Sequence, residues 1–190
     1  FLRRVTRQVA AALPAGVPVG VATKGIEEGT LALMGDVVEA ELPGHPVVAL
    51  SGPSFAREVY QQRPTAVVAS STDAATAAAV QEVFSTSRFR VYSNTDVVGV
   101  ELGGALKNVI AIAAGVLDGL GLGNNARAAL LTRGLAEITR LGVARGAQAI
   151  TFAGLAGMGD LILTATGDLS RNRALGMAMA AGERYADYRQ

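Results

Sequence analysis

The sequence predicts an α/β unit with a mostly parallel sheet, followed by an all-helical unit. Short β-branched runs alternate with alanine-rich stretches through the first half, and no strand pattern occurs after residue 95. Alternating strand and helix patterns are typical of parallel sheets covered by helices. We therefore divide the chain into two expected domains, 1–95 and 96–190.

The first unit begins with a predicted amphipathic helix. Arginines recur through the opening segment 1–13, a pattern that favours such a helix over a signal peptide. Four turn-bounded, β-branched runs then predict short strands, and an alanine-rich run predicts a helix capped by Asp73. The strands are expected at 17–23, 45–51, 64–71 and 89–94, and the helix at 73–86.

The second unit is predicted to consist of helices. A long apolar pattern predicts a helix over 95–123, and a second helix over 124–146 is expected to be capped near Asn125 and closed by Gly146. The glycine-rich segment 152–170 is interpreted as an apolar loop. One more helical pattern follows it.

Composition excludes several classes of protein. The chain has 190 residues, 50% hydrophobic and 17% charged, with a net charge of +1, which excludes a disordered chain and argues against a nucleic-acid-binding protein. The absence of cysteine excludes disulfides and thiolate metal sites, and His45 is the only histidine. The longest uninterrupted apolar run, 109–117, is shorter than the roughly 20 residues of a membrane span, so none is expected.

Lysine is scarce, and its two positions are informative. Lys24 and Lys107 are the only lysines among 17 basic residues. Lys107 lies in a helix that is apolar on nearly every face, so its ammonium is expected to be paired, to have a lowered pKa, or to face a wet cleft. A side chain that reaches solvent along the helix would also explain it. Gly103 and Gly104, one turn earlier, would allow a ligand or another backbone to come close.

Two further segments place polar groups at the ends of predicted strands. Lys24 follows the strand run 17–23, at the carboxyl end where open α/β sheets bind ligands, although taken alone an ordinary loop lysine explains it better. Segment 50–59 leads from a strand into a helix that Pro53 or Ser54 could cap, leaving amide donors for an anion. A plain strand-to-helix turn explains those residues as well.

The helical unit supplies a carboxylate and an arginine cluster. Asp160 lies among glycines and apolar residues, where a carboxylate is costly unless it meets a cation, and Lys107 is the natural candidate. Ser170, Arg171 and Asn172 begin a helix and offer donors suited to a phosphate, or simply a capped helix with solvated arginines. No GxGxxG, P-loop or metal-ligand cluster occurs in the sequence.

These segments together resemble a known family. ATKGIE, LSGPSFAREV, ELGGALKNVIAIAAG, NNARAALLTRGL, GLAGMGDLILT and SRNRALG occur in the order and spacing found in bacterial-type NAD(P)-dependent glycerol-3-phosphate dehydrogenases. The resemblance extends to about Gly176. It implies the second half of a Rossmann-type domain, followed by a helical substrate-binding domain that is incomplete at its carboxyl end.

The resemblance also implies a reaction and roles for individual residues. The reaction is reversible reduction of dihydroxyacetone phosphate to sn-glycerol 3-phosphate with NAD or NADP as cofactor, which supplies phospholipid synthesis. Lys107 is implied as catalytic proton donor and acceptor, and Asp160 as the acid that orients it. The implied substrate-binding residues are Lys24, Gly52, Ser54, Lys107, Asn108, Asp160, Thr164, Ser170, Arg171 and Asn172, and the implied cofactor-binding residues are Lys24, Ala56 and Arg171.

The same resemblance sets expectations for the chain as a whole. We expect a fragment that lacks the amino-terminal, glycine-rich half of the nucleotide domain and is inactive by itself. We also expect poor solubility or folding that depends on a partner. A cytoplasmic location, a phosphorylated small-molecule partner and a possible homodimer are expected, with no nucleic acid and no metal. The alternatives are another two-domain hydroxy-acid or keto-acid dehydrogenase of the same superfamily, and an inactive helical assembly module.

Overall fold

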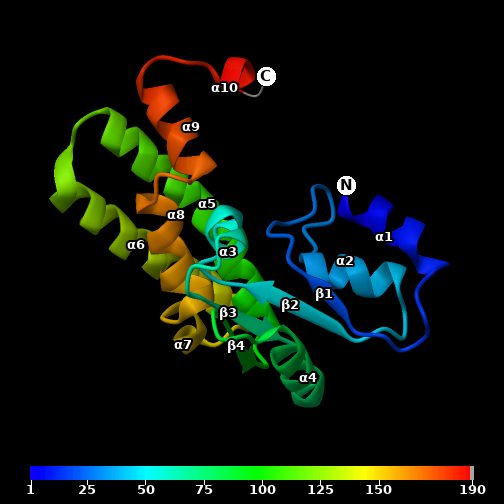
Figure 1. Cartoon of the computed structure of the whole chain (residues 1–190). Coiled ribbons are helices and arrows are strands. Elements are labelled where there is room, and N and C mark those ends of the chain that lie inside the picture. Colours follow the sequence, from blue (N-terminus) through cyan, green and yellow to red (C-terminus); the bar gives the residue numbers. More distant parts are fainter. Residues whose placement is uncertain (189–190) are drawn as a thin grey trace.

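The chain folds into a small sheet flanked by helices, followed by a helical layer, in a computed structural model that describes residues 1–188 (Figure 1). One sheet has the order β1-β2-β3-β4, with β1/β2 and β3/β4 parallel and β2/β3 antiparallel. Each strand lies within a range predicted from the sequence. The strands are β1 Val19–Val21, β2 Val47–Ser51, β3 Thr65–Ser70 and β4 Phe89–Asn94.

Two of the three strand pairings are parallel, which confirms the expectation of a mostly parallel sheet, and the β2/β3 pair is antiparallel. A parallel crossover needs about a dozen residues or more, usually with a helix that returns along the strand. The connection from Ser51 to Thr65 contains only α3 (Ala56–Tyr60), whose five residues are too short to return the chain to the start of β2. The chain therefore turns back directly, and β3 runs against β2.

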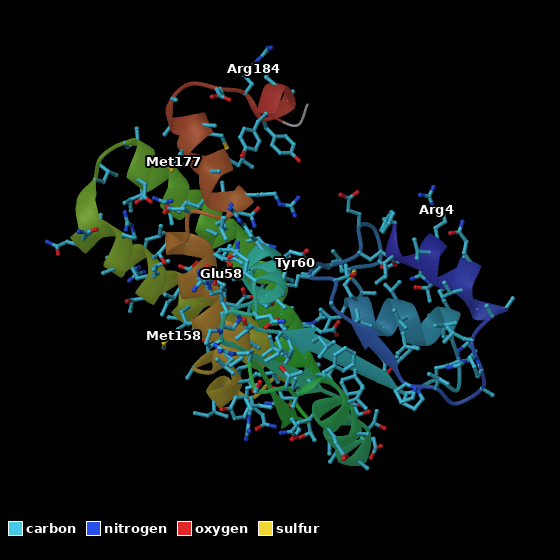
Figure 2. All side chains as sticks on the ribbon, viewed as in Figure 1. Arg4, Glu58, Tyr60, Met158, Met177 and Arg184 are labelled. Carbon is cyan, nitrogen blue, oxygen red and sulfur yellow. The ribbon has the colours of Figure 1, made fainter. Side chains whose placement is uncertain are left out.

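The helices of the first unit are α1 Leu2–Ala10, α2 Met34–Glu41, α3 and α4 Ala74–Phe84. Asp73 caps α4 by accepting hydrogen bonds from the amides of Ala75 and Thr76, which confirms that prediction. The expected cap of α3 is wrong: Phe55 occupies the N-cap position, and the Ser54 hydroxyl donates to the Gly52 carbonyl instead. Figure 2 shows Glu58 and Tyr60 extending outward from α3.

α2 was not predicted from the sequence. It is only eight residues long, and its apolar positions do not extend over enough turns to give a clear helical period. The structure shows why it forms: Met34, Val37 and Val38 are buried in one cluster with Val21 and Val47 of the neighbouring strands. Tertiary packing therefore stabilises this helix more than local propensity does.

The second unit is helical throughout, as predicted. Its elements are α5 Val97–Gly119, α6 Gly123–Ala144, α7 Ala149–Phe152, the π-helical turn η1 Leu155–Gly159, α8 Asp160–Thr166, α9 Arg171–Ala180 and α10 Tyr185–Tyr188. Gly146 follows the end of α6 with a φ of 94°, which confirms the predicted stop. The expected cap near Asn125 is wrong, because the N-cap residue is Leu122, three residues earlier, and α6 begins at Gly123.

The interpretation of segment 152–170 as a loop is also wrong, since η1 and α8 occupy most of it. Its glycines serve close packing. A Cβ on Gly157 would overlap the backbone of Phe152, and a Cβ on Gly103 of α5 would come within 2.6 Å of the Ala156 carbonyl oxygen. The π-helical turn thus lies directly against α5, and it delivers Asp160 to the first turn of α8.

α5 is the central helix of the molecule and packs against α6, α8 and α9 (Figure 1). By length and composition alone, two helical stretches could cross a membrane: Val97–Gly119, with a mean hydropathy of 1.6, and Ala149–Thr166, with 1.4. The buried helices of globular cores meet the same criterion, and α5 buries both Glu101 and Lys107. The absence of a membrane span stays a prediction.

Candidate active site

An open cavity of about 870 Å³ lies between the segment after β1, helix α3, the middle of α5 and the start of α9. All of the site residues predicted from the sequence line this cavity except Gly52, which contacts Lys24, and Asp160, which contacts both lysines. The predicted residues that line it are Lys24, Ser54, Ala56, Lys107, Asn108, Thr164, Ser170, Arg171 and Asn172.

Asp160 joins the two lysines of the chain. Lys107 Nζ donates to Asp160 Oδ1 at 2.9 Å and to Thr164 Oγ1 at 2.5 Å. Lys24 Nζ donates to the other carboxylate oxygen, Oδ2, at 2.5 Å, and to the Gly52 carbonyl oxygen at 3.1 Å. The predicted contact between Asp160 and Lys107 is therefore confirmed, and Asp160 also contacts Lys24. One carboxylate faces two ammonium groups, so the site as a whole remains cationic.

Burial tunes the acidity of Lys107. Only 7% of this residue is exposed, and desolvation lowers the pKa of its ammonium below the ordinary value. The charge of Lys24 lowers the pKa further, whereas the Asp160 carboxylate opposes both effects. A lysine with a lowered pKa can donate and accept a proton closer to neutral pH. The chemistry available at this position is proton transfer.

Two glycines lie beside Lys24, one directly after β2 and one on α5. Gly52 has a φ of 141°, and a Cβ there would lie 2.9 Å from the Cα of Val67, so only glycine fits. Its carbonyl accepts the hydrogen bond from Lys24. On α5, a Cβ on Gly104 would lie 3.3 Å from the side-chain methylenes of Lys24 and 2.8 Å from Ser51 Oγ. The absence of a side chain at Gly104 therefore leaves a channel for Lys24.

The start of α9 is fastened to α5 by polar contacts. Ser170 Oγ caps α9 by accepting from the amide of Arg173, and Asn172 Nδ2 donates to Asn108 Oδ1 at 2.7 Å. Arg173 Nε donates to Asp118 Oδ2, near the end of α5, at 2.7 Å. Arg171 takes no part in these contacts and lines the cavity. The first turn of α9 thus holds a guanidinium at the cavity wall on a rigid support.

Sequence reasoning missed several residues of the wall. Apolar and aromatic side chains carry no pattern that separates a cavity wall from a core, and the segment 183–188 had no recognisable motif. Ser51 was also missed: its hydroxyl is buried beside Gly52 and is the one buried side-chain polar atom in residues 1–188 without a hydrogen-bond partner. The missed wall residues are Ala22, Phe55, Arg57, Leu169, Leu175, Tyr185 and Tyr188.

Two family models match the chain. The model described as NAD-dependent glycerol-3-phosphate dehydrogenase N-terminus matches residues 1–77, and the model described as the C-terminus of the same dehydrogenase matches residues 96–190. The two matches lie in the order expected within one protein. The first match includes strands β1 to β3, and the second covers the helical unit.

Individual relatives agree with the family models. Proteins named glycerol-3-phosphate dehydrogenase [NAD(P)+] from Geobacter sulfurreducens and Myxococcus xanthus are 64% and 54% identical over 98% and 97% of this chain. The chain covers 56% of each, and so spans about half the length of the curated relatives it matches.

Solved structures show the same fold. The glycerol-3-phosphate dehydrogenase of Coxiella burnetii superposes with a TM-score of 0.94 at 43% identity, covering 100% of this chain and 58% of that one. The Saccharomyces cerevisiae enzyme superposes with a TM-score of 0.85 at 31% identity, covering 99% and 57%. The two lysines that contact the buried Asp160 carboxylate thus occur in a fold shared with these dehydrogenases. The chain belongs to the NAD-dependent glycerol-3-phosphate dehydrogenase family.

Proposed function

We propose that this chain supplies the substrate-binding and proton-transfer residues of an NAD(P)-dependent glycerol-3-phosphate dehydrogenase, which reversibly reduces dihydroxyacetone phosphate to sn-glycerol 3-phosphate. The observation that carries the proposal is Lys107: a buried lysine with a lowered pKa, bonded to Asp160 and Thr164 at the floor of a cavity that also holds Lys24 and Arg171. Reduction of a phosphorylated ketone requires a proton donor and a phosphate-binding cation in one cavity.

The residues present fit one part of a nicotinamide cofactor. Lys24, Ala56 and Arg171 all line the cavity, and its volume of about 870 Å³ exceeds what a three-carbon substrate fills. The glycine-rich turn that holds a pyrophosphate in such domains does not occur in the sequence. We therefore assign to this chain the end of the cofactor that lies nearest the substrate. A bound nicotinamide would supply the hydride.

Lys107 performs the proton step in this proposal. Its ammonium donates a proton to the substrate oxygen as the carbonyl carbon is reduced, and the neutral amine takes that proton back in the reverse direction. Asp160 keeps the ammonium oriented, and Thr164 fixes it from the other side. Lys24 adds a second positive charge near the developing alkoxide, where a fixed cation stabilises the negative charge.

Arg171 supports a phosphorylated substrate over the alternative of a hydroxy-acid or keto-acid dehydrogenase. Its guanidinium lines the cavity beside Ser170 and Asn172, and guanidinium groups bind phosphate in a bidentate manner. A non-catalytic assembly module would not need two lysines on one buried carboxylate. We also propose that the two domains divide at 95/96. We propose a cytoplasmic location as well, which the absence of cysteine suits.

Titration calorimetry with glycerol 3-phosphate, glycerol and lactate tests the substrate class. We expect the chain to bind glycerol 3-phosphate, and an Arg171→Ala variant to bind it about tenfold more weakly or worse. Arg133→Ala, a change of an exposed arginine on α6, is the matched control and is expected to bind like the parent. Binding of lactate in preference to glycerol 3-phosphate would favour the alternative dehydrogenase.

A further inference from the structure

A second buried ionisable group of α5 lies outside the cavity. Glu101 is 8% exposed, six residues before Lys107, and it is not among the residues that line the cavity. Burying a carboxylate is costly, and no ion pair holds Glu101 within residues 1–188. Neither the proton step nor the phosphate contact uses it. Its contacts therefore need a separate explanation.

Glu101 caps the helix that follows the Lys24 segment. Its Oε1 accepts a hydrogen bond from the amide of Gly35, the second residue of α2, at 2.8 Å. Helix amides at this position lack partners within the helix, so a carboxylate is a favourable acceptor there. A Cβ on Gly35 would lie 3.1 Å from Glu101 Oε2, closer than ordinary contacts, so the approach depends on glycine.

Apolar packing accompanies this hydrogen bond. Leu33, the residue before α2, lies in one buried cluster with Leu102, the neighbour of Glu101 on α5. In Figure 1 the first turn of α2 is the end of that helix nearer to α5. The start of α2 is thus joined to α5 by one polar and one apolar contact.

The start of α2 is in turn connected closely to Lys24. Residues 26 and 33 form an antiparallel bridge, and the amide of Glu27 donates to the Ala32 carbonyl at 2.9 Å. The segment between Lys24 and Gly35 is therefore a closed turn rather than a slack loop. Gly35 lies two residues after Leu33, and Leu33 is paired with Ile26, which lies two residues after Lys24. A displacement of Gly35 relative to α5 is therefore passed to Lys24 through this bridge.

We propose that Glu101 is a positioning residue: through Gly35 it fixes the segment that carries Lys24 relative to the helix that carries Lys107. The inference rests on the proposed function, in which both lysines contact the substrate. Without this contact the start of α2 would keep its apolar contact with Leu102 of α5, but it would lose its polar contact with that helix.

The charge state of Glu101 makes the contact sensitive to pH. Burial raises the pKa of its carboxyl to about 7, and the charges of Asp36 and Glu39 on α2 raise it too, whereas the Gly35 amide opposes them. An ionised carboxylate is a stronger acceptor than a neutral one. The contact is therefore firmest above neutral pH and weakens as the pH falls through 7.

Binding of glycerol 3-phosphate by the 190-residue chain tests this, measured by calorimetry about one pH unit below and one above 7. Glu101→Ala and Gly35→Ala are expected to weaken binding roughly tenfold at the higher pH. Glu101→Gln, which keeps an acceptor oxygen, is expected to recover most of the loss. The ratio of its dissociation constant to that of the parent is expected to change several-fold between the two pH values. Taking this ratio cancels titration of the phosphate itself.

Glu82→Gln, the same change on an exposed acid of α4, is the matched control, and circular dichroism verifies that each variant is folded. The inference is overturned if folded Glu101→Ala and Gly35→Ala bind like the parent. If Lys24→Ala and Arg171→Ala are still impaired in the same experiment, the proposed function stands. Unimpaired binding by the latter pair would contradict the proposed function itself.

Discussion

At the residue scale, Asp160 decides how the two lysines behave. It is 2% exposed and contacts both ammonium groups, so each lysine loses its counter-charge if the carboxylate is removed. The sequence predicted the contact with Lys107 because a carboxylate among glycines and apolar residues needs a cation. The contact with Lys24 was not predictable, since it depends on how β1 and α8 approach one another across 136 residues.

Asp160→Asn is expected to lower the pKa of Lys107 further, because the Asp160 carboxylate is what raises that pKa against burial and the charge of Lys24. The loss of a buried counter-charge is also expected to destabilise the fold by about 3–5 kcal/mol. The pKa of Lys107 can be followed by NMR of ¹³C-labelled lysine, and stability by urea denaturation. Glu58→Gln, an exposed acid on α3, serves as control. A Lys107 pKa that rises in Asp160→Asn would contradict this account of the site.

At the element scale, the contact of α5 with α9 positions the polar wall of the cavity. A Cβ on Gly115 of α5 would overlap the backbone of Arg173, and a Cβ on Gly176 would overlap the backbone of α5. The two helices therefore touch backbone to backbone, which brings Asn172 within reach of Asn108. The sequence predicted both helices, but it gave no sign of which glycines serve packing and which serve turns.

Gly115→Ala is expected to push α9 away from α5 and to destabilise the chain by about 1–3 kcal/mol, as overpacking of a core does. Gly20→Ala in β1 is the matched control, because a Cβ there meets only Leu50 Cδ1 at an ordinary 3.5 Å. Thermal denaturation compares the two variants. Equal melting temperatures for Gly115→Ala and Gly20→Ala would show that the α5–α9 contact is not as tight as described.

Some helices and strands can be predicted from the sequence and others cannot, because their sequence patterns differ in length and clarity. The strands and long helices carry enough apolar period to be found from the sequence, and Asp73 is a strong local cap. α2 is too short for its period to be clear, and the glycines of η1 resemble turn residues, so the sequence predicts a loop there. The sequence predicts a mostly parallel sheet but does not show which pair is antiparallel, because that depends on the connection between β2 and β3.

At the scale of the whole molecule, Glu101 links the sheet-bearing unit to the helical unit. The pKa of its carboxyl is about 7 in the fold, against 4.5 for an unburied group. Between these two values the folded chain holds the proton more tightly than the unfolded chain does. The free energy of unfolding therefore falls as pH rises through this window.

Glu101→Gln removes the contribution of this carboxyl to the pH dependence of the free energy of unfolding. Urea denaturation about two pH units below and one above 7 is expected to show the parent losing on the order of 2–3 kcal/mol more stability than the variant over this range. Glu82→Gln is expected to follow the parent. If Glu101→Gln and the parent lose stability equally as the pH rises, the carboxyl of Glu101 does not titrate near neutrality.

Lys107 transfers the proton in the proposed reaction. The measurement that tests it uses a chimera in which residues 1–190 replace the corresponding segment of the Geobacter sulfurreducens relative, which is 64% identical. Oxidation of NADH or NADPH with dihydroxyacetone phosphate is followed for the chimera and for its Lys107→Arg variant. Arginine keeps the positive charge but does not release a proton near neutral pH.

We predict that Lys107→Arg lowers kcat at least about 100-fold while KM changes only a few-fold, since proton transfer is lost and the charge is kept. Arg133→Lys, the reverse exchange on the exposed face of α6, is predicted to leave kcat unchanged. A Lys107→Arg chimera with kcat close to that of the parent chimera would contradict the assignment of Lys107 as proton donor.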